Sequence, residues 1–177
     1  MATFIRRVVG AACLRSATYE EVEAEPAATP QALGVVLLAG LGTGVGWAGI
    51  GGDRLWATVV LSVLAVAAWI AWALVTYLIG FHLLPEGQTR ANPGELLRTL
   101  GFAQAPPILN ALGAVPGVGG AVLGFTAVWA LAAMVVAIRQ ALDYTSTLRA
   151  VGVCVAGWVL ALVMFGVISV FFTTPVG

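Results

Sequence analysis

Five apolar stretches dominate this sequence, and each is too long for the core helix of a small soluble domain. Four of them run from about residue 32 to 50, 56 to 84, 121 to 142 and 147 to 172, and another begins at residue 92. About 20 apolar residues in a helix cross the ~30 Å hydrocarbon core of a bilayer. Because lipid offers the backbone no hydrogen bonds, such segments must be helical. The sequence therefore predicts an all-α, polytopic membrane helix bundle with five transmembrane spans.

The charge composition agrees with this fold class and narrows the partners. Only 9% of the residues are charged, against about 25% in a soluble domain. Eight arginines and eight acids give a formal net charge of zero. Without a basic excess the chain has no electrostatic footprint for nucleic acid. We expect membrane lipids and other membrane proteins as its partners.

Residues 1–30 form a more polar segment before the membrane domain, residues 31–177. Within it, the apolar residues of Thr3–Leu14 recur at helical period, and arginines flank them. This pattern predicts an amphipathic helix lying at the membrane surface. A signal peptide is the alternative, because Arg6 and Arg7 precede the short apolar run.

The first apolar stretch carries glycines at alternate positions, including Gly40 and Gly44. Small residues spaced four apart allow two helices to approach closely in lipid, where packing drives association. We therefore expect this stretch to contact another membrane protein or to mediate self-association.

The third stretch begins with a strong start signal and is then interrupted. Asn92, Pro93 and Glu95 are the residues of a helix cap. Pro106 and Pro107 then remove two backbone donors at membrane depth, close to Gln104. The sequence predicts either a kink packed against a neighbouring helix or a hinge beside a small binding cavity.

The arginines predict the orientation of the chain. With the amino terminus in the cytoplasm, seven arginines lie inside and only Arg54 lies outside, which satisfies the positive-inside rule. The carboxyl terminus is then external. Arg98, Arg139 and Arg149 all fall near the cytoplasmic boundary, where they either anchor helix ends or form a site for a phospholipid headgroup.

Residues for chemistry are scarce. The chain has one histidine, no cysteine or histidine spacing typical of a metal site, and no acidic residue in the middle of a predicted span. We therefore expect no cofactor, no metal and no enzymatic activity.

Three stretches of this sequence resemble the bacterial branch of the Yip-domain family of integral membrane proteins. They are the pre-span segment Ala17–Leu33, the central motif ELLRTLGFAQAP at Glu95–Pro106, and the segment Trp129–Asp143. The resemblance implies five spans in the bacterial cytoplasmic membrane, a cytoplasmic amino terminus and a periplasmic carboxyl terminus. The acidic Asp/Glu-Leu-Tyr-Gly-Pro motif of the eukaryotic relatives is absent.

The function predicted from these features is that of a non-enzymatic protein that organises or scaffolds membrane components. Two alternatives are an accessory subunit of a larger membrane complex and a small-molecule or lipid transporter. The candidate lipid or partner contacts are as follows: Arg98, Arg139, Arg149, Gln104, Pro106, Pro107, Gly40 and Gly44.

Overall fold

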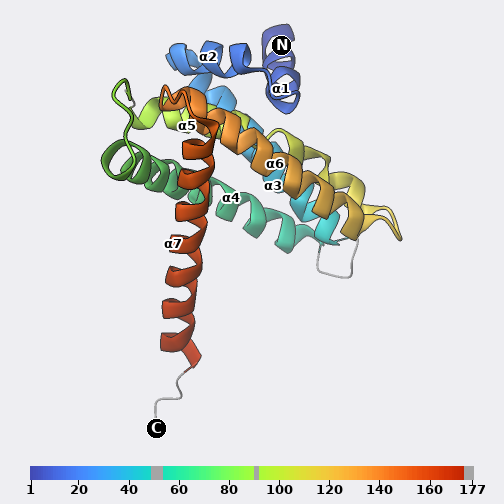
Figure 1. Cartoon of the computed structure of the whole chain (residues 1–177). Helices are drawn as coiled ribbons and strands as arrows, with labels where there is room; N and C mark the ends of the chain where they lie inside the picture. Colours follow the sequence, from blue (N-terminus) through green and yellow to red (C-terminus); the bar gives the residue numbers. More distant parts are fainter. Residues whose placement is uncertain (49–53, 90–91, 174–177) are drawn as a thin grey trace.

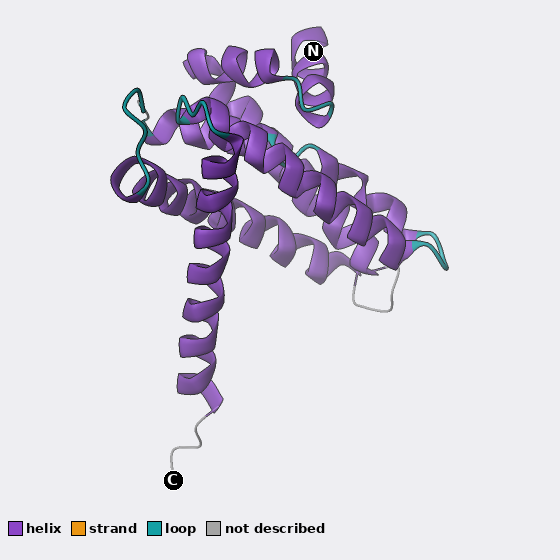
Figure 2. Cartoon of the chain, viewed as in Figure 1, coloured by secondary structure: helices purple, strands orange, loops and turns teal. Residues whose placement is uncertain are grey.

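The computed structural model describes residues 1–48, 54–89 and 92–173. The chain is 84% helical, and the described residues contain no strand (Figure 2). The all-α prediction is therefore confirmed. The end of the first predicted span, at residues 49 and 50, and Arg90 lie outside the described residues.

Short helices at the amino terminus lead into a bundle of longer ones (Figure 1). The amino-terminal elements are α1 (Ala2–Ala12), α2 (Ser16–Ala24) and the 3₁₀ turn η1 (Pro26–Ala28). The bundle consists of α3 (Thr29–Ala48), α4 (Arg54–Tyr77), the π-helical turn η2 (Leu78–Leu83), α5 (Pro93–Phe102), the 3₁₀ helix η3 (Pro106–Ala114), α6 (Gly119–Ala141) and α7 (Thr147–Thr173).

Within the described residues, three helical segments are long and apolar enough to cross a membrane. They are Pro26–Trp47, Thr58–Leu83 and Gly119–Ala141. The third predicted span is instead two short helices, α5 of 10 residues and η3 of 9. In α7, the apolar part whose side chains are described reaches only from Thr147 to Leu160.

Helix α3 packs against α4 on one side through its glycines. A Cβ atom on Gly40 would lie 2.8 Å from the Cα of Ser62, and one on Gly44 would lie 2.5 Å from the Cα of Thr58. As the α3 numbers rise the α4 numbers fall, so the two helices are antiparallel. Their backbones approach closely because glycine has no side chain to separate them.

The other side of α3 is covered by the broken third segment. A Cβ atom on Gly42 would lie 2.6 Å from the carbonyl oxygen of Ile108, and one on Gly46 would lie 2.2 Å from that of Asn110. Here both sets of numbers rise together, so η3 runs parallel to α3. The glycine face of α3 is thus filled on two sides by helices of its own chain.

Several of the largest buried side chains lie at one end of the bundle, where α2, α5 and the last turns of α6 meet (Figure 1). Tyr19, Leu96, Phe102, Ile138 and Leu142 are among the largest fully buried side chains. Away from this end many apolar side chains are exposed, for example Val63 at 64% and Val128 at 69%. Such surfaces suit hydrocarbon as the solvent.

Helix α7 diverges from the rest of the bundle (Figure 1). Near its middle it meets α4, because a Cβ atom on Gly157 would lie 2.9 Å from the ring of Trp72. Trp72 and Trp158 also form an edge-to-face pair with ring centroids 5.9 Å apart. Apolar residues on several sides of the helix are exposed, including Trp158, Leu160 and Val163.

Candidate functional site

A buried arginine holds the amino-terminal segment onto the crowded end of the bundle, the end where α2, α5 and the last turns of α6 meet. Arg98 is only 8% exposed. Its Nε atom lies 3.0 Å from the carbonyl oxygens of both Val22 and Glu23. Because α2 ends at Ala24, these carbonyls have no partner within the helix. The guanidinium therefore caps the negative end of the α2 dipole from a neighbouring helix.

A second arginine joins α1, α2 and the start of α3. Arg7 is 7% exposed; its Nε atom donates to Glu21 at 2.9 Å and its Nη1 atom donates to Gln31 at 3.0 Å. Arg6 also pairs with Glu21, at 2.6 Å. Hydrogen bonds from Arg6 and Arg7 lower the pKa of Glu21 to about 2. A helix, α1, covers most of the predicted stretch Thr3–Leu14, and its Arg7 faces other protein elements.

Two aromatic side chains satisfy the carboxyl end of α1. The Tyr19 hydroxyl donates to the carbonyl of Ala11 at 3.1 Å, and the indole N–H of Trp129 donates to that of Ala12 at 2.7 Å. The chain then reverses at Leu14, which has a φ of 58°. The amides of Leu14 and Arg15 donate to the carbonyls of Ala11 and Gly10, which completes a Schellman motif.

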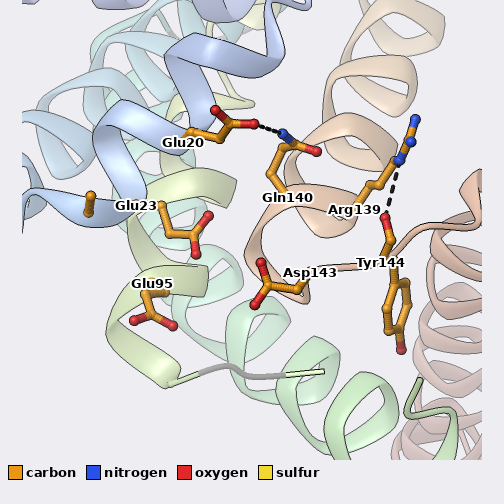
Figure 3. Close-up of a pocket in the computed structure, with 8 residues that line it drawn as sticks. Glu20, Glu23, Glu95, Arg139, Gln140, Asp143 and Tyr144 are labelled. Atoms are coloured by element: carbon orange, nitrogen blue, oxygen red, sulfur yellow. Dashed lines mark hydrogen bonds between the residues drawn. The ribbon is translucent and has the colours of Figure 1, made fainter. Parts of the chain in front are cut away.

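An open cavity of about 390 Å³ lies between α2, α5 and the turn after α6. Figure 3 shows the carboxylates of Glu23 and Asp143 directed into it, with Glu95 beside them. Glu20, at its edge, accepts a hydrogen bond of 2.7 Å from Gln140. Despite these acids, no group of side chains in the described part of the chain has an arrangement that could hold a metal ion.

Glu23 has the most perturbed carboxyl group in this cavity. Burial is the main cause that raises its pKa to about 7; the neighbouring carboxylates of Asp143, Glu95 and Glu20 contribute to the rise, and the charge of Arg98 opposes it. A carboxyl group in such surroundings exchanges its proton near neutral pH.

The other two candidate arginines are exposed and serve the start of α7. Arg139 does not pair with Asp143; it donates to the carbonyl of Tyr144 at 3.3 Å and to the hydroxyl of Thr147 at 3.2 Å. Arg149 donates to the carbonyl of Pro85 at 2.9 Å. Since Arg98 is buried under α2, the three arginines do not converge on one site.

Glu86, which the sequence did not single out, caps α7. Its carboxylate accepts hydrogen bonds from the backbone amides of Thr145 and Ser146, at 3.0 and 3.3 Å, and lies 3.6 Å from Arg149. The hydrogen bonds from Thr145 lower the pKa of Glu86, and those from Ser146 and the charge of Arg149 add to the effect. Glu86 lies about 60 positions before the helix that it caps, so no local sequence pattern indicates this contact.

At the proline break, the chain turns between α5 and η3. Pro106 has no amide hydrogen to donate to the carbonyl of Phe102, four residues earlier. The amide of Ala105 donates to this carbonyl instead, at 3.0 Å. Pro106 is buried, and Pro107 is partly exposed. The predicted interruption is therefore present, as a change from an α-helix to a 3₁₀ helix.

A polar bridge crosses three helices at this depth. The side-chain amide of Asn110 donates to the hydroxyl of Thr43 at 3.0 Å and accepts from the hydroxyl of Thr126. Interhelical hydrogen bonds of this kind join helices in lipid. Thr43 and Thr126 were not among the residues predicted from the sequence. The signal that could have indicated them is an isolated hydroxyl in an apolar stretch.

A second cavity, of about 500 Å³, opens beside the proline break. Three of the candidate residues line it: Gln104, Pro107 and Gly40. Gln104 is partly buried, and its side-chain amide makes no hydrogen bond within the described residues. The indole N–H of Trp72, in the same wall, is buried and has no partner there either.

No family model matches this chain, and neither the curated proteins nor the solved structures compared with it include a match.

Proposed function

We propose that this chain is a non-enzymatic integral membrane protein of the bacterial cytoplasmic membrane that organises membrane components through helix packing and lipid contact. The observation that carries the proposal is the contrast between its two parts. One end is closely packed and rich in arginine, whereas the long helices beyond it expose apolar side chains. Membership of the Yip-domain family is part of this proposal and rests on residues 95–106.

Five crossings remain compatible with these helices if the third is made by two elements. Ten residues of α5 and nine of η3 extend about 15 Å and 18 Å, respectively. Together they match the ~30 Å thickness of the hydrocarbon core. The parallel course of η3 and α3 supports this arrangement, because the first and third spans of such a protein cross in the same direction.

The orientation follows from the arginines. Arg7 and Arg98 both contact α2, and Arg139 and Arg149 flank the start of α7 at the same end of the bundle. By contrast, α4 begins at Arg54, near the opposite end of α3. The positive-inside rule then assigns the crowded end, and with it α1 and α2, to the cytoplasm.

Reporters fused to the two termini test the topology. A reporter that is active only in the cytoplasm should be active when fused to the amino terminus. A reporter that is active only in the periplasm should be active when fused to the carboxyl terminus. Activity of both reporters in one compartment would contradict an odd number of crossings. Release of the protein from membranes without detergent would contradict membrane insertion altogether.

A second candidate function is that of an accessory subunit, and the course of α7 favours it. A helix with apolar residues exposed on several sides and few neighbours has surface available for helices of another protein. Gly40 and Gly44, by contrast, are already packed within the chain. Purification from native membranes in a mild detergent separates the candidates: a stable stoichiometric complex supports the subunit, and a free chain or homo-oligomer contradicts it.

A further inference from the structure

The cavity beside the proline break is formed by all the main helices of the bundle. Its wall consists of residues from α3, α4, the α5–η3 junction, α6 and α7 as follows: Val36, Ala39, Gly40, Thr43, Leu64, Ala65, Ala68, Trp69, Trp72, Leu100, Gln104, Pro107, Met134 and Trp158. A volume of about 500 Å³ is within the usual range for pockets that hold small molecules. The break creates this space, because α5 and η3 do not continue as one straight helix.

The cavity opens sideways, between helices, rather than toward the arginine-rich end. Leu64, Ala68 and Trp158 belong to its wall and are exposed, Leu64 at 56% and Trp158 at 49%. In a protein that spans the membrane, the medium at this opening is hydrocarbon. Water is a poor occupant, because it needs two to four polar partners and this wall is mostly apolar.

Two polar groups in this wall have no partner within the described residues, the indole N–H of Trp72 and the side-chain amide of Gln104. The hydroxyl of Thr43 already donates to Ala39 and accepts from Asn110, but the amide of Gln104 has no partner within the described residues. An unpaired amide at membrane depth costs free energy that a suitable ligand recovers. The occupant therefore combines an apolar body with a hydrogen-bonding oxygen.

The position of Gln104 identifies the part of a lipid that carries this oxygen. Gly101, three residues earlier, packs against Ala32 near the beginning of α3. Gln104 is thus only a few turns from the arginine-rich end, close to the level at which the glycerol esters of one leaflet join their acyl chains. An acyl chain that extends from that level into the cavity contacts Trp72 and Trp158, which belong to the same wall.

We propose that this cavity binds one phospholipid from the arginine-side leaflet, with an acyl chain against the tryptophans and an ester oxygen at Gln104. The proposal rests on the membrane insertion argued above. It assigns to the broken segment a role beyond a packed kink, because the junction supplies both the space and the polar contact.

Two adjacent alanines on α4 provide a matched test. Ala67 and Ala68 are both exposed, but only Ala68 lines the cavity. The full chain and the variants A68F and A67F are purified in detergent, exchanged into micelles that contain palmitoyl-oleoyl phosphatidylethanolamine and phosphatidylglycerol, and examined by native mass spectrometry. A68F should lose about tenfold in affinity for the retained lipid, whereas A67F should match the unaltered chain.

The variant Q104L tests the polar contact, because leucine keeps a similar volume and removes the amide. It should weaken lipid retention by about tenfold without a change in oligomeric state. Equal retention by the unaltered chain, A68F and Q104L would overturn the proposal, and so would a second copy of the chain in place of lipid. Should A68F fail to fold, Q104L decides alone. Failure of membrane insertion is recognised separately, by the terminal reporters.

Discussion

Single residues decide how the amino-terminal segment is attached. The guanidinium of Arg98 donates to two carbonyls of α2, which lie 76 and 75 positions earlier in the sequence. A buried guanidinium that donates to unpaired helix carbonyls is a charge-assisted contact with no substitute nearby.

Replacement of Arg98 by methionine should therefore loosen α2 at a cost of about 1.5–3 kcal/mol, the usual range for hydrogen bonds to a charged group. Hydrogen–deuterium exchange of residues 16–24 should accelerate, while that of α6 stays unchanged. The control is Arg149→Met, since Arg149 is exposed and contacts Pro85 and Glu86 rather than α2. Equal exchange in the two variants would contradict the role of Arg98.

Leu14 offers a gain in stability at the same scale. It has a φ of 58°, a left-handed conformation that strains a branched side chain, and it is 36% exposed. Leu14→Gly should stabilise the α1–α2 connection by about 0.5–1 kcal/mol. The comparison is Asp143→Gly at a φ of 52°, where the gain should be smaller because aspartate tolerates this conformation. Thermal unfolding in detergent measures both.

At the scale of elements, the glycines of α3 set the distance between helices. Gly44→Ala would place a Cβ atom 2.5 Å from the Cα of Thr58, whereas a Cβ atom on Gly34, in the same helix, has nothing within 4 Å. Gly44→Ala should destabilise the protein by about 1–3 kcal/mol through overpacking. Gly34→Ala should be neutral or stabilising by up to about 1 kcal/mol. Unfolding by SDS in mixed micelles gives both values, and a similar loss in both would contradict close packing of α3 on α4.

The elements also show what the sequence could and could not predict. The start of α5 was predictable because its signal is local: Asn92 and Glu95 exchange hydrogen bonds at 3.1 and 2.9 Å, as a capping box requires. The break at Pro106 was equally local. The direction of η3 beside α3 was not, because it depends on which helices the freed segment meets.

The candidate site was predictable in part for the same reason. Proximity of Gln104 to the break follows from the chain itself, whereas a cavity beside the break was one of two alternatives and is formed by helices distant in sequence. The burial of Arg98 under α2 depends on contacts between residues far apart, and the positive-inside rule reads arginines only as charges near a boundary. The acidic cavity around Glu23 likewise draws its residues from three separate segments.

For the whole molecule, two carboxyl groups make the docking of the amino-terminal segment depend on pH in opposite directions. Glu21 has its pKa lowered to about 2, so the stability it provides is present above its ordinary value of 4.5 and is lost as the pH falls toward 2. Glu23 has its pKa raised to about 7, so its contribution is complete below 4.5 and is lost as the pH rises toward 7.

The segment should therefore be bound most tightly between about pH 4 and 5, where both contributions are largest. Hydrogen exchange of α2, corrected for the intrinsic pH dependence of exchange, should show a minimum in this range. Glu23→Gln should abolish the loosening at higher pH and leave the acid side unchanged. A profile that is flat from pH 5 to 8 in the unaltered chain would contradict this prediction.

The attachment of α1 and α2 also has a consequence for the order of assembly. Their contacts require Arg98, Trp129 and Gln140, which lie at the middle and toward the end of the chain. A ribosome releases the amino terminus first, before the residues that α1 and α2 contact. The earliest-synthesised helices therefore complete their attachment only when residues 75 to 120 positions further along the chain have been translated.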